Sequence, residues 1–401
     1  MRLIRGVVTA LLVLMIGAFG TVAVAAPTAQ SPCDVYAEAG TACVAAYSSA
    51  RALFASYDGA LYQVRRSSDG EVTDIGVTEP GGYADASAQD RFCADTSCVV
   101  ATIYDQSGQH NDLVPQAPTT AVYSNFFYTH EGVDASALPI TVNGRPAYGF
   151  KFVDAPPGGG PSIGGLHACV TSLACTALTG HRGQAYNNGN RRANGIAVDG
   201  QPEGIYGVFG GTRSGSDCCF GFGNSEISGT DTGNGHMDTL NFSRACWNAC
   251  GPGNGPWVQA DLENGMFMTG QTTEQPQNYS AYVGGSYLSG NGFCCAATEA
   301  NTALPYPFVT AILESPGTGT FALKGTPSDT PTLRTFYNGP TPPGPGYAPL
   351  HKEGGIILGS GGDQGTTDGD FFEGAITFGV PPAAAQATVQ ADIANQHYTM
   401  R

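Results

Sequence analysis

Glycine is the feature that most limits how this chain can fold. It occupies 57 of the 401 positions, whereas only 12% of the residues are charged. Such a composition is typical of many turns and short strands rather than of helical bundles. Apolar, β-rich runs bounded by Gly, Asp or Pro mark the strands that we expect, at residues 99–104, 147–153, 204–209, 257–268, 308–313, 320–324, 333–337, 356–358 and 371–378.

Many short strands with few helices predict an all-β fold, a jelly-roll-like or concanavalin-like β-sandwich. Residues 42–57 are rich in Ala and Ser, with apolar side chains loosely at helical spacing, and predict a short helix. The Ala-rich segment 381–400 predicts a terminal helix. Residues 155–192 are rich in Gly, Pro, Asn and Thr and predict a long surface insertion. We expect one domain over residues 26–401.

The first 25 residues have the pattern of a signal peptide. Arg2 and Arg5 form a basic start, an apolar stretch follows, and small residues at 23 and 25 form a cleavage site. No later stretch is apolar and long enough to span a bilayer. We therefore expect a secreted, extracellular monomer that is not bound to a membrane.

The formal net charge of −16 bears on the class of ligand. Nucleic-acid affinity depends on contacts between basic side chains and phosphates, so such an acidic chain is a poor candidate for it. A neutral polymer such as a polysaccharide faces no comparable electrostatic barrier.

All 12 cysteines follow the predicted signal, and this even number suits disulfide bonds in an oxidising compartment. Spacing suggests the local pairs Cys33–Cys43, Cys93–Cys98 and Cys169–Cys175. Spacing leaves the pairing of four others open, namely Cys246, Cys250, Cys294 and Cys295. Zinc is the competing interpretation, but the spacings fit no finger or ribbon, and we expect no metal and no other cofactor.

Cys218 and Cys219 are adjacent in the sequence. A bond between them would close a strained ring with a flat sulfur face. It would add little stability, because the entropy that a disulfide removes from the unfolded chain grows with loop length. A strained feature with little stabilising effect suggests a working surface. The alternative is that each cysteine bridges elsewhere.

The sequence lacks the motifs of serine hydrolases, zinc proteases, phosphate loops and dinucleotide-binding domains. His236 and His351 lack metal-ligand spacing, and we interpret them as structural or surface residues. Asp261 and Glu263 would point to one face of a strand, because side chains alternate along it. Such a pair is either a solvated face or a functional one.

Two further segments could bear on chemistry. The strand at 356–358 runs into a Gly-rich turn that ends on Asp363, where a ligand could approach the backbone closely. A calcium loop or a plain acidic turn are the alternatives, although the spacing misses the EF-hand pattern. Trp247 lies between Cys246 and Cys250, and is either a platform for stacking a sugar or a core residue.

Together these segments resemble the catalytic domain of the α-L-arabinofuranosidase B family, family 54 of the glycoside hydrolases. Nine stretches match in the order of the family, from about Cys33 to the end of the chain. They are residues 32–48, 51–64, 84–90, 103–108, 202–206, 217–220, 232–237, 255–264 and 352–363.

The resemblance implies a β-sandwich that hydrolyses glycosides with retention. Glu263 resembles the family's nucleophile and Asp363 its general acid/base. Cys218 and Cys219 resemble a vicinal disulfide that packs on the arabinose ring, and the pairs Cys33–Cys43 and Cys93–Cys98 also fit the family. The residues that resemble further contacts to the sugar are Trp247, Asp261, Asn264 and Gly362.

The implied substrate is a polysaccharide or oligosaccharide with arabinofuranosyl branches, cleaved by exo action without a cofactor. A related specificity (galactofuranosidase or xylosidase) and a noncatalytic carbohydrate-binding sandwich are the alternatives. Two departures from the family are expected. The insertion at 155–192 and residues Cys294 and Cys295 have no clear counterpart, and the chain ends at Arg401, too early for a C-terminal arabinose-binding β-trefoil.

Overall fold

Antiparallel strands make up most of the ordered structure, and the expected all-β class is confirmed. The described part of the chain contains three helices, α1 (Pro32–Glu38), α2 (Ala86–Phe92) and α4 (Ala383–Asn395). The computed structural model describes residues 30–116, 126–128, 132–153, 181–215, 219–228, 232–244, 249–263, 265–270, 296–297, 300–360 and 368–401. No helix among these residues is long and apolar enough to cross a membrane.

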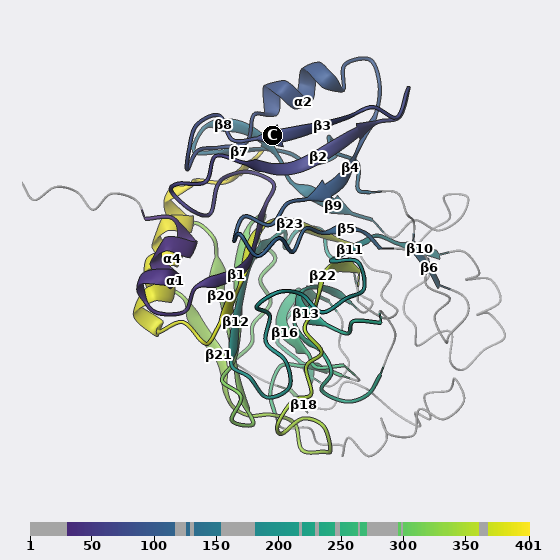
Figure 1. Ribbon diagram of the computed structural model, residues 1–401. Coiled ribbons are helices and arrows are strands. Elements are labelled where there is room, and N and C mark those ends of the chain that lie inside the picture. The colour runs from purple at the N-terminus through teal and green to yellow at the C-terminus, as the bar shows by residue number, and fades with distance from the viewer. Residues whose placement is uncertain are drawn as a thin grey trace, which may run out of the picture.

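Two seven-stranded sheets form the body of the molecule (Figure 1). The first sheet has the order β1-β23-β12-β19-β20-β21, with β9 also paired to β23. Its strands are β1 (Cys43–Ser48), β9 (Phe150–Phe152), β12 (Glu203–Phe209), β19 (Val309–Ser315), β20 (Thr320–Pro327), β21 (Arg334–Pro340) and β23 (Gly369–Phe378).

The second sheet has the order β17-β16-β14-β13-β22-β11-β5. Its strands are β5 (Val114–Pro115), β11 (Ala185–Asn187), β13 (Phe220–Ser225), β14 (Asp238–Ser243), β16 (Trp257–Asp261), β17 (Met266–Phe267) and β22 (Gly355–Ser360).

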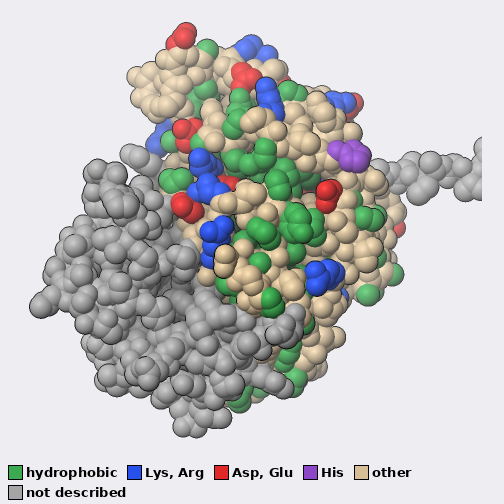
Figure 2. Space-filling view, turned by 180° about the vertical axis from the view of Figure 1, so that it is seen from behind, with side chains coloured by type: hydrophobic (Ala, Val, Ile, Leu, Met, Phe, Trp, Pro, Cys, Tyr) green, Lys and Arg blue, Asp and Glu red, His purple; other side chains and the backbone are tan. Residues whose placement is uncertain are grey.

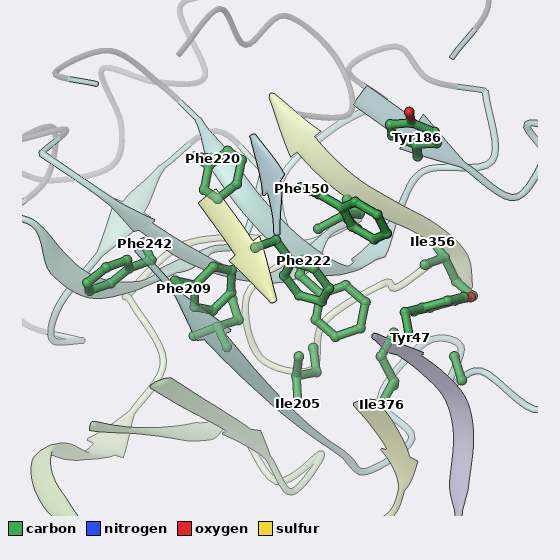
Figure 3. Packing of buried hydrophobic residues seen from close by; sticks show 14 of the residues in the cluster. Tyr47, Phe150, Tyr186, Ile205, Phe209, Phe220, Phe222, Phe242, Ile356 and Ile376 are labelled. Atoms are coloured by element: carbon green, nitrogen blue, oxygen red, sulfur yellow. The ribbon is translucent and has the colours of Figure 1, made fainter. Parts of the chain in front are cut away.

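The core lies between these two sheets. Phe209 of the first sheet contacts Phe220 and Phe242 of the second, with ring centroids 6.1 and 5.6 Å apart. Phe222 and Phe371 meet in the same way at 5.4 Å. Figure 3 shows the rings of Phe209, Phe220, Phe222 and Phe242 between the opposing strands. Close packing of large aromatic side chains is the main apolar contribution to holding the layers together.

The first sheet is covered on its outer face as well. In β12, Ile205 and Phe209 belong to the central core, whereas Tyr206 and Val208 pack with residues of α1 and α4. Successive side chains of a strand point to opposite faces, so every residue of β12 is buried. The two helices lie side by side on that outer face (Figure 1).

The prediction of a helix over residues 42–57 was wrong. Residues Cys43–Ser48 form β1, which pairs with β23. Ala45 and Tyr47 enter the central core, and Ala46 faces the helices. A strand buried on both faces is apolar or small at every position, so its sequence lacks the polar alternation that would have distinguished it from a helix.

Strand β23 lies between β1 and β12, so a strand late in the chain pairs with one near its start. An ion-pair network fixes it to α4: Arg51 Nε lies 2.6 Å from Glu373 Oε2, and Arg51 Nη1 lies 2.7 Å from Asp392 Oδ2. All three side chains are nearly or fully buried. The expected terminal helix is present here as α4.

Smaller sheets surround the sandwich. Their strands are β2 (Ala60–Arg66), β3 (Val72–Gly76) and β4 (Cys98–Ile103) in one, β7 (Pro139–Val142), β8 (Arg145–Tyr148) and β24 (Thr399–Met400) in another, and the parallel pairs β6 (Phe126–Tyr128) with β10 (His181–Gly183) and β15 (Ala249–Cys250) with β18 (Ala296–Ala297). Disulfides Cys33–Cys43 and Cys93–Cys98 are both formed. The expected pair Cys169–Cys175 and the signal at 1–25 lie outside the described residues.

Part of the expected surface insertion at 155–192 belongs to the sandwich instead. Within it, β11 pairs with β22 and β5 in the second sheet. Tyr186 is 1% exposed, and its hydroxyl donates to Val100 O (2.7 Å) and accepts from Val133 N (2.8 Å). A strand of three residues is too short to stand out in a sequence rich in turn-forming residues.

Candidate active site

Glu263 occupies a strained turn rather than a strand. Strands β16 and β17 pair with Asp261 opposite Met266, so Leu262, Glu263 and Gly265 belong to the turn between them. Glu263 has a φ of 61°, in the left-handed region that few residues other than glycine adopt. The expectation that Asp261 and Glu263 share one strand face is therefore wrong, because β16 ends at Asp261. Strained backbone of this kind is often found at functional sites.

The Glu263 side chain is 1% exposed and contacts a backbone amide. Thr232 N lies 3.3 Å from Glu263 Oε1 and 3.4 Å from Glu226 Oε1. Glu226 follows directly after β13 and is 3% exposed. One N–H therefore points to two buried carboxylates. Nothing in the sequence singled out Glu226, because it lies in no recognisable motif.

A third carboxylate, that of Glu353, accepts hydrogen bonds from Thr232 and Ile227. Its Oε1 accepts from the Thr232 hydroxyl at 2.7 Å, and its Oε2 accepts from Ile227 N at 2.9 Å. His236 Nδ1 lies 3.0 Å from Oε1. Burial alone would raise the pKa of Glu353, but hydrogen bonds from Thr232, His236 and Ile227 lower it below its ordinary value.

His236 thus lies in a polar network close to Glu263, whereas we had expected a structural or surface residue. Its Nδ1 is 2.8 Å from Thr232 Oγ1 and 3.0 Å from Glu353 Oε1. A relay of the serine-hydrolase type uses both ring nitrogens, one toward the hydroxyl and one toward the carboxylate. Because both contacts here use the same nitrogen, Thr232, His236 and Glu353 do not form such a triad.

Backbone hydrogen bonds join the three segments that build this region. Gly235 N donates to Leu262 O at 2.9 Å, and His351 N donates to Gly235 O at 2.8 Å. Gly235 has a φ of 75°, and a Cβ placed there would come within 1.9 Å of Gly346 O. Only glycine fits this position, because Gly346 lies so close. The hydrogen bond to Leu262 O connects the same residue to the turn that carries Glu263.

A buried charge cluster lies beneath the same segments. Lys352 Nζ is 3.1 Å from Glu203 Oε1 and 3.5 Å from Asp238 Oδ2, and all three side chains are at most 1% exposed. Ser315 donates to Asp238 at 2.8 Å, and Asn224 donates to Glu203. Lys352 precedes Glu353, and Asp238 follows closely on His236. The cluster therefore anchors the strand ends from which the network around Glu263 projects.

Of the other residues expected to contact the sugar, the structure describes Asp261 and Cys219. Asp261 is 6% exposed at the end of β16, next to the Glu263 turn. Cys219 precedes β13, is 3% exposed and is disulfide-bonded. Its expected partner Cys218 lies outside the described residues, as do Trp247, Asn264, Gly362 and Asp363.

The pairing register of the second sheet separates Cys219 from Asp261 and Glu263. Phe220 pairs with Ser360, and through β14 it is level with Val258 of β16. Asp261 lies three residues further along β16, about 10 Å at the usual strand rise. Cys219 is therefore near the end of β22, from which the chain continues toward Gly362 and Asp363, whereas Glu263 is at the other end of the sheet. The described geometry does not by itself bring Cys219 close to Asp261 and Glu263.

The sandwich of two antiparallel sheets is shared with a solved structure described as a GH54 α-L-arabinofuranosidase. A family model described as "Alpha-L-arabinofuranosidase B, catalytic" matches residues 32–158, 170–292 and 285–399. The chain belongs to that family. The matched segments include residues 170–192 and both Cys294 and Cys295, so the expectation that these parts lack a family counterpart was wrong; residues 159–169 fall between matched segments.

Individual relatives agree with the family match. The chain is 41% identical over 379 residues to alpha-L-arabinofuranosidase B of Emericella nidulans, covering 92% of this chain and 62% of that protein. It is 39% identical over 386 residues to alpha-L-arabinofuranosidase B of Aspergillus oryzae, covering 96% and 65%. The chain thus spans less than two thirds of the length of these curated relatives.

The fold is also similar to that of a solved family member. A crystal structure of an arabinofuranosidase complexed with arabinofuranosyl-α-1,2-xylobiose is 34% identical, with a TM-score of 0.76 over 93% of this chain and 66% of that chain. The sheet architecture described above is therefore that of the family.

Proposed function

We propose that this chain is the catalytic domain of a secreted, retaining α-L-arabinofuranosidase. Its substrate is a terminal arabinofuranosyl residue of arabinoxylan, arabinan or a related hemicellulose. The observation that carries the proposal is the family match, which spans the segments of both Glu263 and Asp363. The burial and strained backbone of Glu263 add support, because both are common at reacting side chains.

The proposed reaction uses two carboxyl groups. Glu263 attacks the anomeric carbon while Asp363 donates a proton to the departing oxygen, which leaves a covalent glycosyl-enzyme. Asp363 then accepts a proton from water, and the water hydrolyses the ester with overall retention. Retaining glycosidases hold their two carboxyl groups about 5–5.5 Å apart. Our mechanism therefore requires this spacing between the carboxyl groups of Glu263 and Asp363.

The remaining residues are proposed to shape a pocket for one furanose ring. Asp261, Asn264 and Gly362 would bind its hydroxyl groups, and Trp247 and a Cys218–Cys219 disulfide would form apolar walls. A pocket suits a side branch and hence exo action. The proposed neutral substrate agrees with the net charge of −16. On the face in Figure 2, basic side chains stand beside acidic ones rather than forming a broad basic surface.

Hydrolysis of 4-nitrophenyl α-L-arabinofuranoside by the purified, oxidised protein tests this proposal. Release of nitrophenol, with the α-anomer of arabinose as the first product, would support a retaining arabinofuranosidase. The same assay with galactofuranoside and xyloside substrates distinguishes the related specificities. A folded protein that binds arabinoxylan but hydrolyses none of these substrates would instead be a noncatalytic carbohydrate-binding sandwich.

Replacing Asp363 by Asn is expected to affect substrates according to their leaving group. A nitrophenolate departs without a proton, whereas a sugar alkoxide does not, so kcat/KM on an arabinoxylan oligosaccharide should fall about 10²–10⁴-fold. The first step on the nitrophenyl substrate should be much less affected. Measured kcat/KM values for both substrates, with the wild type as control, provide the check. Equal losses on both would contradict the acid role.

A further inference from the structure

Glu353 is a partly buried carboxylate that the proposed mechanism does not use. Its two oxygens bind different donors, the Thr232 hydroxyl and the Ile227 amide, which are five residues apart. Its side chain is 18% exposed, and its own amide donates to His236 O at 3.3 Å. Glu353 therefore connects two points of the chain that lie more than 100 positions before it.

This connection fixes the position of the Thr232 backbone amide. It donates to Glu263 Oε1 at 3.3 Å, so the position of Thr232 influences where the Glu263 carboxylate lies. A hydrogen bond from an N–H to a carboxylate favours the ionised form, which is the form that can attack a sugar. Without the Glu353 carboxylate, Thr232 would keep its contact to His236 but lose its strongest anchor, the 2.7 Å bond.

We propose that Glu353 is a positioning residue for the nucleophile: by holding Ile227 and Thr232, it aims the Thr232 amide at Glu263. This inference rests on the proposed role of Glu263. Glu353 has no contact with the sugar in this scheme and acts only through Thr232. Its loss should therefore lower kcat much more than it changes KM, because orientation affects the reacting carboxylate rather than substrate binding.

The test compares variants that remove one hydrogen bond at a time. Glu353→Gln replaces one accepting oxygen by a donor, and Thr232→Val removes the hydroxyl while keeping the amide. Each should lower kcat on 4-nitrophenyl α-L-arabinofuranoside about 10–100-fold, with KM changed less than about threefold. Thr232→Ser keeps both groups and should retain near wild-type kcat.

Coupling between the two residues gives a second readout. If Glu353 acts through Thr232, the double variant should lose no more activity than the more damaged single variant. Glu314→Gln is the matched control. Its carboxylate is 13% exposed and pairs with Lys324 and Gln386 away from this region, so its kcat should stay unchanged.

Several results would overturn the inference. One is a wild-type kcat in Thr232→Val or Glu353→Gln; another is a loss in Thr232→Ser as large as in Thr232→Val. A lower thermal midpoint with unchanged kcat per folded molecule would show a purely structural role. Each of these results counts against the inference only if the wild type is active and the Glu263→Gln variant is inactive. An inactive wild type would overturn the proposed function, and the inference with it.

Discussion

Glu263→Gln is expected to lower kcat on 4-nitrophenyl α-L-arabinofuranoside on the order of 10⁴-fold or more, as is usual for removal of an enzyme nucleophile. An amide is too weak a nucleophile to form the glycosyl-enzyme. The fold should survive, because the Gln side-chain oxygen can still accept from Thr232 N, which lies 3.3 Å from Glu263 Oε1. Steady-state kinetics and a thermal unfolding curve, measured on the same preparation, check both statements.

The matched control is Glu226→Gln. Glu226 is nearly as buried and accepts from the same amide at 3.4 Å, so it is the carboxylate best placed to be mistaken for the nucleophile. We expect its variant to retain activity within about tenfold of the wild type, the effect of a neighbouring rather than a reacting group. An inactive Glu226→Gln beside an active Glu263→Gln would transfer the nucleophilic role to Glu226.

Lys352→Met is expected to cost about 3–5 kcal/mol of stability, the usual effect of removing one partner of a buried ion pair. The ammonium lies 3.1 Å from Glu203 and 3.5 Å from Asp238, and its loss leaves two carboxyl groups buried together without a cation. Urea unfolding at neutral pH measures the effect. A loss below about 1 kcal/mol would show that the cluster relaxes or takes up water.

The effect should also depend on pH. Burial raises the pKa of Glu203 from its ordinary 4.5 to about 8; the charge of Asp238 adds to this rise, and Lys352 opposes it. Glu203 therefore contributes stability that is complete below pH 4.5 and is lost as the pH rises toward 8. Without Lys352 the pKa of Glu203 should rise further, so the variant should lose more stability at pH 8 than at pH 5.

Adding Glu203→Gln to Lys352→Met provides the control. It removes the carboxyl group that can no longer be paired, so part of the lost stability should return at pH 8 and little at pH 5. A loss that is the same at both pH values, with no recovery in the double variant, would contradict this account of the cluster.

Several of the longer strands could be predicted from the sequence, because short apolar runs between turn-forming residues have few other outcomes. Strands β12, β19, β20, β22 and β23 overlap the expected segments closely. Strand β1 could not be recognised, since burial on both faces removes the alternation that identifies a strand. The turn at Glu263 was also missed, because alternating residues 257–268 fit one long strand as well as two paired short ones.

The candidate site was less accessible to sequence reasoning. Glu263 and Asp363 came from a family resemblance and not from a pattern of the residues themselves. The contacts around Glu263 join Thr232 to Glu353 across 121 positions, and no local spacing reports such a pair. His236 was interpreted as a structural or surface residue, because a single histidine has no spacing pattern that indicates a function. Polar networks of this kind are fixed by tertiary packing, which one sequence does not encode locally.

The position of β23 has a consequence for how the protein is made. This strand, Gly369–Phe378, lies inside the first sheet and is hydrogen-bonded to β1 and β12, which are translated more than 150 residues earlier. A ribosome therefore releases the strand that joins them long after both. Until then β1 and β12 have unpaired edges, and the nascent chain depends on remaining unaggregated rather than on folding stepwise from its first residues.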